Sequence, residues 1–211
     1  MTIEIYEDVD DTWDNLLLKS DMATIYQTKG YAEIVSTINK IPLFLKFLDP
    51  SGNIIGQLLI TIESQLSKKK FVGNLLKNLF PSIGNIYTWT YGPIIFDNNY
   101  DVYDELEKFL LSKKCSVSGW GHPFHHQFPT PFKKLKINNW STFLIDLSLS
   151  KFEIYQNIDK HSGRKNIERS EKRGVKIEEI NENNLIDYVN LVNDERKLEK
   201  REFLDYDYML K

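Results

Sequence analysis

Residues 160–179 read KHSGRKNIERSEKRGVKIEE, a strongly basic segment around which the rest of the chain is organised. Six of its first fourteen residues are Lys or Arg, and only two are acidic. Lys165, Arg169 and Arg173 recur every four residues, so on a helix they would form one stripe. The pattern therefore predicts a short basic helix whose charged surface suits the phosphate groups of a ligand.

The helix is predicted to end at Gly174, because glycine readily takes the left-handed conformation that follows many helices. Apolar residues then alternate with charged ones, which predicts a strand over residues 174–180. Five cations are candidate phosphate-binding residues: Arg164, Lys165, Arg169, Lys172 and Arg173. Ile167 faces away from the cations and is expected to anchor the helix to a core. The alternative interpretation is a solvated helix face with pairs such as Arg164 with Glu168, and charge alone favours it.

The composition is that of a globular protein whose basic surface is local. At 211 residues, with 41% hydrophobic and 27% charged residues, the chain can form a substantial core. Its net charge of −3 means that any phosphate site must be confined to one region. The single cysteine, Cys115, excludes an internal disulfide framework and a multi-cysteine zinc site. The sequence has no signal-peptide pattern and no apolar run as long as a membrane span, so a cytoplasmic location is expected.

Hydrophobic periodicity predicts a mixed α/β (α+β) fold. Strands are predicted at residues 3–5, 43–48, 53–63, 83–96, 116–119, 140–147 and 174–180. Helices are predicted after Asp11, at 30–38 and 99–114, from Ser150, through the basic segment, and from Asn181 or Asn183 to about Lys200. The sequence DPSG at residues 49–52 predicts the turn of a hairpin. Ser150 and Glu153 have the spacing of a capping box.

Residues 66–80, LSKKKFVGNLLKNLF, predict a basic amphipathic helix. Its apolar residues fall on one face, and four lysines flank them. Such a helix can pack on its own domain or lie on an anionic membrane surface. Packing on its own domain is the commoner outcome. Binding to a membrane surface would give the protein a peripheral membrane contact.

Three of the four histidines lie within residues 120–126, WGHPFHH. The spacing of His122 and His125 would allow both to bind one metal ion, but no neighbouring Asp, Glu or Cys completes a ligand set. We therefore expect no metal. An imidazole here could act as a general base, because it titrates near neutral pH. The third interpretation is a loop with partly solvated histidines.

Three motifs match one family in order and approximate spacing. Residues 164–175 have the form R-x-x-I-x-R-x-x-x-x-G-V. Residues 25–31, IYQTKGY, contain a Gln–aromatic element, and residues 91–95, YGPII, a Gly-Pro strand end. Together they resemble the Fem-type aminoacyltransferases, in which a basic helix joins two halves of the protein. The similarity spans roughly residues 13–205.

The resemblance implies a GNAT-like mixed sheet flanked by helices, followed by the start of a second GNAT-like unit. The implied boundaries are a domain at 1–148, a connecting basic segment at 149–173 and an incomplete second domain at 174–211. The sheet of that second domain would be missing. The chain would then be a fragment of a longer product, a naturally shortened protein, or one half completed by a partner chain.

The resemblance also implies an activity. Fem-type enzymes pass an aminoacyl group from a charged tRNA, or another activated donor, to an amine of a nucleotide- or lipid-linked cell-envelope precursor, as in peptidoglycan synthesis. It implies no cofactor, and it adds four candidate groove residues: Gln27, Tyr91, Gly92 and His122. No catalytic dyad is recognisable, so the catalytic residues stay unassigned.

Other functions stay open. A non-enzymatic module would bind nucleic acid or a membrane surface through the basic helix and residues 66–80, and a truncated relative could be inactive. An acyl-CoA-dependent GNAT protein is disfavoured, because no pyrophosphate loop of the form Q/R-x-x-G-x-G/A occurs at a strand-to-helix turn. Residues 31–38 contain no Lys or Arg to meet phosphates from the opposite side, which is a departure from nucleotide-linked enzymes.

Overall fold

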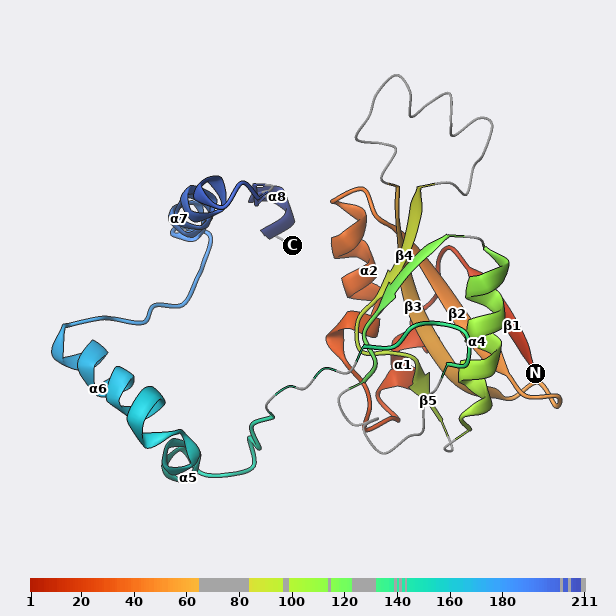
Figure 1. Cartoon of the computed structure of the whole chain (residues 1–211), viewed down its shortest axis with the longest axis horizontal. Coiled ribbons are helices and arrows are strands. Elements are labelled where there is room, and N and C mark those ends of the chain that lie inside the picture. Colours follow the sequence, from red (N-terminus) through yellow and green to blue (C-terminus); the bar gives the residue numbers. More distant parts are fainter. Residues whose placement is uncertain are drawn as a thin grey trace, which may run out of the picture. The chain divides into compact units, whose positions relative to one another are not determined.

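The chain forms two compact units, residues 1–139 and 140–210 (Figure 1). The computed structural model describes residues 1–64, 84–96, 99–113, 115–122, 132–138, 140, 142, 144–201, 203–204 and 206–209. The predicted amphipathic helix at 66–80 lies outside these residues, as does His125. No helix in the described ranges is long and apolar enough to cross a membrane.

The first unit is built on one mixed sheet. Its strands are β1 (Thr2–Tyr6), β2 (Ile41–Leu48), β3 (Ile54–Ser64), β4 (Asn85–Trp89), β5 (Ile94–Ile95) and β6 (Ser116–Gly119). The order across the sheet is β1-β2-β3-β4-β6, and β5 pairs with β3. Neighbours are antiparallel except β4 and β6, which run parallel because helix α4 (Asp101–Ser112) lies between them in the chain. The predicted mixed α/β fold is confirmed.

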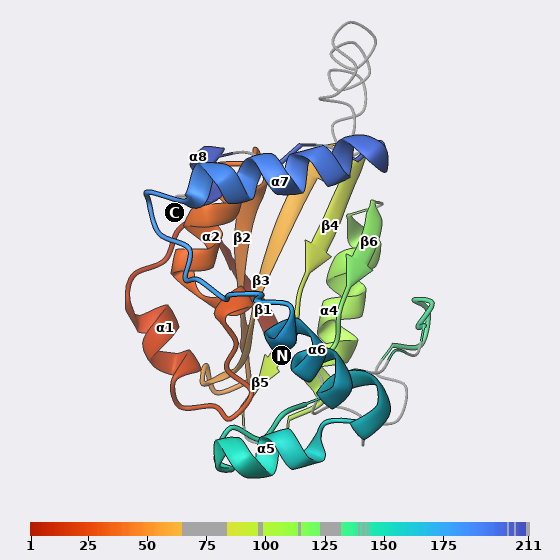
Figure 2. The same cartoon turned by 90° about the vertical axis from the view of Figure 1, so that its left-hand side faces the viewer.

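Each face of this sheet carries its own hydrophobic core. One core joins α4 to β2 and β3 through Leu45, Phe47, Leu58, Ile60, Val102, Leu106 and Leu110. The other joins α1 (Thr12–Leu17) and α2 (Lys29–Ser36) to the same strands through Trp13, Leu17, Ala32, Phe44 and Leu59. Side chains alternate along a strand, so the neighbours Phe44 and Leu45 belong to opposite cores. Helices α1 and α2 accordingly lie on one side of the sheet and α4 on the other (Figures 1 and 2).

The hairpin of β2 and β3 forms where it is predicted. Asp49 Oδ1 accepts hydrogen bonds from the main-chain N–H groups of Ser51 and Asn53, each at 2.8 Å. Gly52 has a φ of +85°, a conformation that glycine adopts without steric cost. The turn chemistry therefore sets the register of the two central strands.

The predicted aromatic strand at 83–96 is interrupted between Trp89 and Ile94, in agreement with the Gly-Pro pair at 92–93, where a strand must end or bulge. Thr88 of β4 lies opposite Thr61 of β3, and Ile94 of β5 lies opposite Gln57. From Thr88 to Ile94 the chain advances by six residues, whereas the paired residues of β3, from Thr61 to Gln57, are only four apart. The two extra residues force the outer chain away from β3 between β4 and β5, as at an enlarged bulge.

The regular elements described in the second unit are all helices. It contains α5 (Lys151–Asn157), a π-type segment η4 (Lys160–Arg164), α6 (Lys165–Lys172), α7 (Leu185–Leu198) and α8 (Tyr206–Met209). The predicted capping box at the start of α5 is present. Ser150 Oγ accepts from the Glu153 N–H at 3.3 Å, and Glu153 Oε2 accepts from the Ser150 N–H at 2.9 Å. The predicted basic helix is confirmed as α6.

Two predicted strands of this unit do not form. Among residues 140–147, those that the structure describes belong to no ladder. Residues 175–180 are an open segment between α6 and α7 without a strand partner in the described chain (Figure 1). Alternation of apolar and polar residues is necessary for a half-buried strand, but a strand also needs a neighbour to supply its hydrogen bonds.

The end of α6 agrees with its sequence signal. Gly174 has a φ of +73°, its N–H donates to Glu171 O at 2.9 Å, and the Val175 N–H donates to Ser170 O at 3.0 Å. These two bonds cap the helix as in a Schellman motif. Ile167, however, is 38% exposed, so the expected anchoring to a core is not observed.

Candidate functional site

Gln27 is completely buried and holds the interrupted strand to the sheet. Its Oε1 accepts a hydrogen bond from the main-chain N–H of Leu59 at 2.7 Å, and its Nε2 donates to the main-chain O of Thr90 at 2.8 Å. Its own main-chain O accepts from Trp13 Nε1 at 2.7 Å. The amide therefore replaces the ladder bonds that are lost where the outer chain leaves β3. Both ends of this candidate groove residue are engaged within the protein.

Tyr91 and Gly92 form the turn at the interruption. Tyr91 has a φ of +51°, a left-handed conformation that is uncommon for a residue with a Cβ. The Gly92 N–H donates to Trp120 O at 3.2 Å, and Gly92 O accepts from Trp89 Nε1 at 3.1 Å. Gly92 is buried, and a Cβ there would lie 2.5 Å from Leu58 Cδ1. Close packing of the main chain thus requires glycine at this position.

The side chains around this turn form an aromatic cluster, which consists of Tyr26, Tyr31, Tyr91, Trp120 and His122. Tyr26 lies edge-on to Tyr31 and Tyr91, with ring centroids 5.3 and 5.5 Å apart. Tyr91 in turn lies edge-on to Trp120 and His122, at 6.4 Å in each case. Trp120 is 51% exposed and Tyr26 is also exposed, so the cluster presents aromatic surface to a ligand.

His122 is the buried end of the aromatic cluster. It is 6% exposed, and burial lowers the pKa of its imidazole below the usual value. The ring is therefore neutral at pH 7 and can accept a proton. The described part of the chain contains no group of three His, Cys, Asp or Glu residues that could hold a metal ion.

A shallow groove of about 490 Å³ adjoins the aromatic cluster at Tyr31. Its lining comes from the segment before α2 and the first turns of α2: Ile25, Thr28, Gly30, Tyr31, Glu33 and Ile34. The described lining is largely apolar, and Glu33 is the one charged residue in it. Since the described lining offers a phosphate no basic side chain, the groove suits an apolar or amine-bearing part of a ligand.

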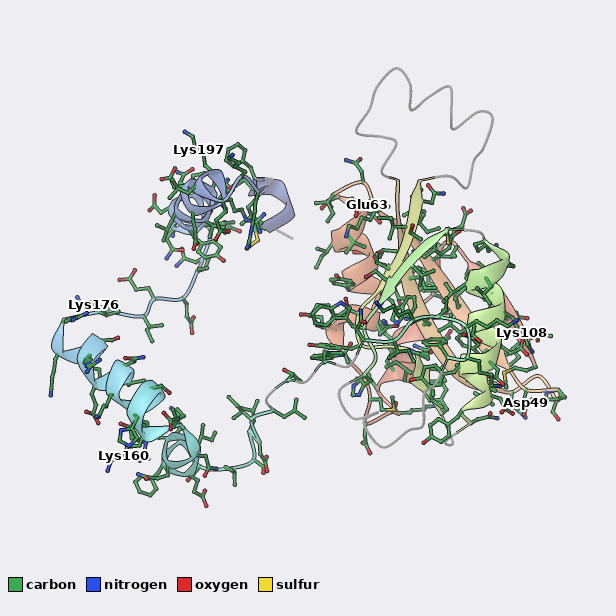
Figure 3. All side chains as sticks on the ribbon, viewed as in Figure 1. Asp49, Glu63, Lys108, Lys160, Lys176 and Lys197 are labelled. Carbon is green, nitrogen blue, oxygen red and sulfur yellow. The ribbon has the colours of Figure 1, made fainter. Side chains whose placement is uncertain are left out.

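Four of the five predicted phosphate-binding residues lie together on one helical surface. Lys165, Arg169, Lys172 and Arg173 are exposed, and their side chains form no ion pair or hydrogen bond with the described residues. Lys160 and Lys176, labelled in Figure 3, lie on either side of this surface along the chain. The cations are thus available to an external anion.

Arg164 differs from the other four cations. Its Nη1 donates to Gln156 Oε1 at 3.0 Å, and its guanidinium lies 5.9 Å from the ring centroid of Tyr155. The i,i+4 pair of Arg164 with Glu168 does not form; Glu168 instead accepts a long hydrogen bond of 3.5 Å from the Tyr155 hydroxyl. Arg164 therefore links α5 to η4 in addition to any contact with a ligand.

The sequence did not single out Tyr26 or Trp120 as site residues. The available signal was adjacency, because Tyr26 precedes the candidate Gln27 and Trp120 lies two residues before His122. No protein-family model, curated protein or solved structure matches the chain.

Proposed function

We propose that this chain is a Fem-like N-acyl or aminoacyl transferase, or the substrate-binding half of one. It would move an acyl or aminoacyl group to an amine of a cell-envelope precursor. The observation that carries the proposal is the order of the elements in the first unit. One strand, two helices, an antiparallel hairpin, an interrupted central strand, a helix and a parallel strand follow in the order expected of a GNAT-like unit from its N-terminal end. In that class, central strands that part from each other expose main-chain groups to the acyl donor. Here Gln27 engages the main-chain groups of Leu59 and Thr90 at the interruption, so the proposal rests on the element order.

The chemistry of amine attack on an activated carbonyl fits the aromatic cluster. Such a reaction needs positioned substrates, hydrogen-bond donors for the developing oxyanion and a group that takes the proton of the amine. Exposed rings of Tyr26 and Trp120 supply binding surface. His122, neutral because of its burial, is the proton acceptor in this proposal.

The phosphates of the donor or precursor would bind α6 through Lys165, Arg169, Lys172 and Arg173. A pyrophosphate at the start of α4 is disfavoured, because its first turn carries Asp101 and Asp104 and would repel an anion. An aminoacyl-tRNA therefore fits as donor better than acyl-CoA, and a cytoplasmic location follows from that choice of donor.

The test is a comparison of ligands at several salt concentrations. Binding of tRNA, a UDP-sugar and acetyl-CoA to the purified chain would be measured by titration calorimetry, beside Arg169→Ala and the control Lys197→Ala. Lys197 lies on α7, outside the basic helix. Selective binding that persists at high salt and is lost at least tenfold in Arg169→Ala alone supports the proposal. Equal loss in both variants, or no loss in either, rejects the assignment of Arg169.

A second candidate is a non-enzymatic module for polyanions or an anionic membrane surface. It is favoured by the same exposed cations of α6, which form no ion pair with the described residues. Its signature is different, because non-specific binding of phosphates falls steeply with salt and discriminates little among ligands.

A further inference from the structure

The segment after α6 combines exposed apolar side chains with a free main chain. Val175, Ile177 and Ile180 are 60%, 98% and 52% exposed. In the described chain, the main-chain groups of Lys176, Ile177 and Glu178 form no hydrogen bond with protein. Apolar side chains in water are unfavourable, and a free main chain with alternating residues can extend a sheet. The segment has what a strand needs except a neighbouring strand.

Strand β1 offers an edge that such a segment can join. It stands at one end of the sheet order of the described strands. Ile3 packs partly against the core, and Ile5, on the same face of the strand, is 45% exposed. Glu4 lies on the other face and is exposed. Directly after the strand come the acidic residues of the sequence EDVDD at 7–11.

We propose that residues 175–178 of one copy of this chain add to β1 of a second copy as an antiparallel strand. In the register that pairs like with like, Val175 lies opposite Ile5, Lys176 opposite Glu4, and Ile177 opposite Ile3. Both apolar pairs then share the face of Ile3 and Ile5, and the ion pair occupies the other face.

Charge favours antiparallel pairing of residues 175–178 with β1, and the apolar side chains favour this one register. Antiparallel pairing brings the basic end of α6 beside the acidic residues 7–11, whereas parallel pairing would carry it to the other end of β1. A shift by one residue would place Ile177 opposite Glu4, on the polar face. A further shift in the same direction would place Glu178 opposite Glu4, where like charges repel.

Each copy both donates and accepts a strand, so two such pairings close a two-fold dimer. The inference does not depend on the proposed transferase activity, because no substrate takes part in it. It also explains why the predicted strand at 174–180 lacks a partner in the single chain.

The test is a charge exchange read by light scattering after size exclusion. The parent is expected at twice the chain mass of 24.8 kDa at micromolar concentration. Lys176→Glu and Glu4→Lys should each weaken the dimer about tenfold, because each of two pairings loses roughly threefold. The double variant Lys176→Glu with Glu4→Lys should regain the parental affinity. A monomeric parent, or single variants that dimerise like the parent, would overturn the proposal.

A cross-link fixes the register and the identity of the partner. In a Cys115→Ser background, Ile3→Cys with Ile177→Cys should form a disulfide between two chains, since opposed residues lie within its reach. The control, Ile3→Cys with Lys176→Cys, presents the second thiol on the opposite face and should cross-link much less. A disulfide within one chain, or equal cross-linking of both pairs, contradicts the second-copy strand.

Discussion

Replacing Gln27 tests whether its amide closes the gap in the sheet. In Gln27→Leu the buried N–H of Leu59 loses its acceptor, and the main-chain O of Thr90 loses its donor. An unsatisfied buried group costs about 1–3 kcal/mol. Thr90 is only half-buried and can regain part of its bond from water. We therefore expect the free energy of unfolding of the first unit to fall by about 2–3 kcal/mol.

In the variant Gln27→Glu, the stabilising effect of the side chain at position 27 should depend on pH. A protonated glutamic acid has the shape of glutamine, accepts from Leu59 and donates to Thr90, whereas the carboxylate cannot donate. Burial and the facing carbonyl should raise the pKa of this carboxyl in the folded state above its unfolded value of about 4.3. The folded state then binds the proton more tightly, so the stabilising contribution is complete below about pH 4.3 and is lost as pH rises. The loss is about 1.4 kcal/mol for each pH unit up to the raised pKa.

The assay is urea unfolding between pH 4 and 7, followed by tryptophan fluorescence, to which Trp13, buried beside Gln27, contributes. Gln57→Leu is the matched control. Gln57 is equally buried, but its Oε1 has no hydrogen-bond partner among the described residues, and its Nε2 makes one long bond of 3.3 Å to Trp13 O. Gln57→Leu should therefore lower the free energy of unfolding by less than Gln27→Leu does. The reasoning fails if the two leucine variants are equally destabilised. It also fails if the difference in stability between Gln27→Glu and the parent does not change with pH.

Three further predictions follow from local geometry. Gly92→Ala should destabilise the first unit by about 1–3 kcal/mol, because its methyl group would overlap Leu58, and thermal unfolding measures the loss. Gly174→Ala should cost only about 1 kcal/mol, seen as reduced helicity by circular dichroism, because its φ is +73° but no atom of the described chain beyond its two neighbours lies within 4 Å of a Cβ there. The lowered pKa of His122 means that the unfolded state binds more protons below about pH 6.5, so stability should fall as pH drops from there. His122→Phe should remove that part of the slope in urea titrations at pH 5–7, and an unchanged slope would contradict the burial effect.

The amino-acid sequence alone determined those features whose causes are local. The turn at residues 49–52 follows from Asp49, which bonds the next main-chain N–H groups, and from Gly52 with its positive φ. Ser150 with Glu153 starts α5, and Gly174 ends α6. Each of these signals acts within a few residues, so its outcome does not depend on the rest of the fold.

Only the tertiary structure decided what depends on residues far apart in the chain. Gln27 carries no sequence signal of its contact with Leu59, 32 residues away, or with Thr90, 63 residues away. The Gly-Pro pair at 92–93 indicates that the strand ends or bulges there, but the contacts of Tyr91 with Tyr26, Trp120 and His122 come only from the fold. The pattern at 175–180 is that of a strand, yet none forms in the single chain. A local pattern states which faces are apolar, whereas hydrogen-bond partners and burial are supplied by whichever distant segments the fold brings alongside.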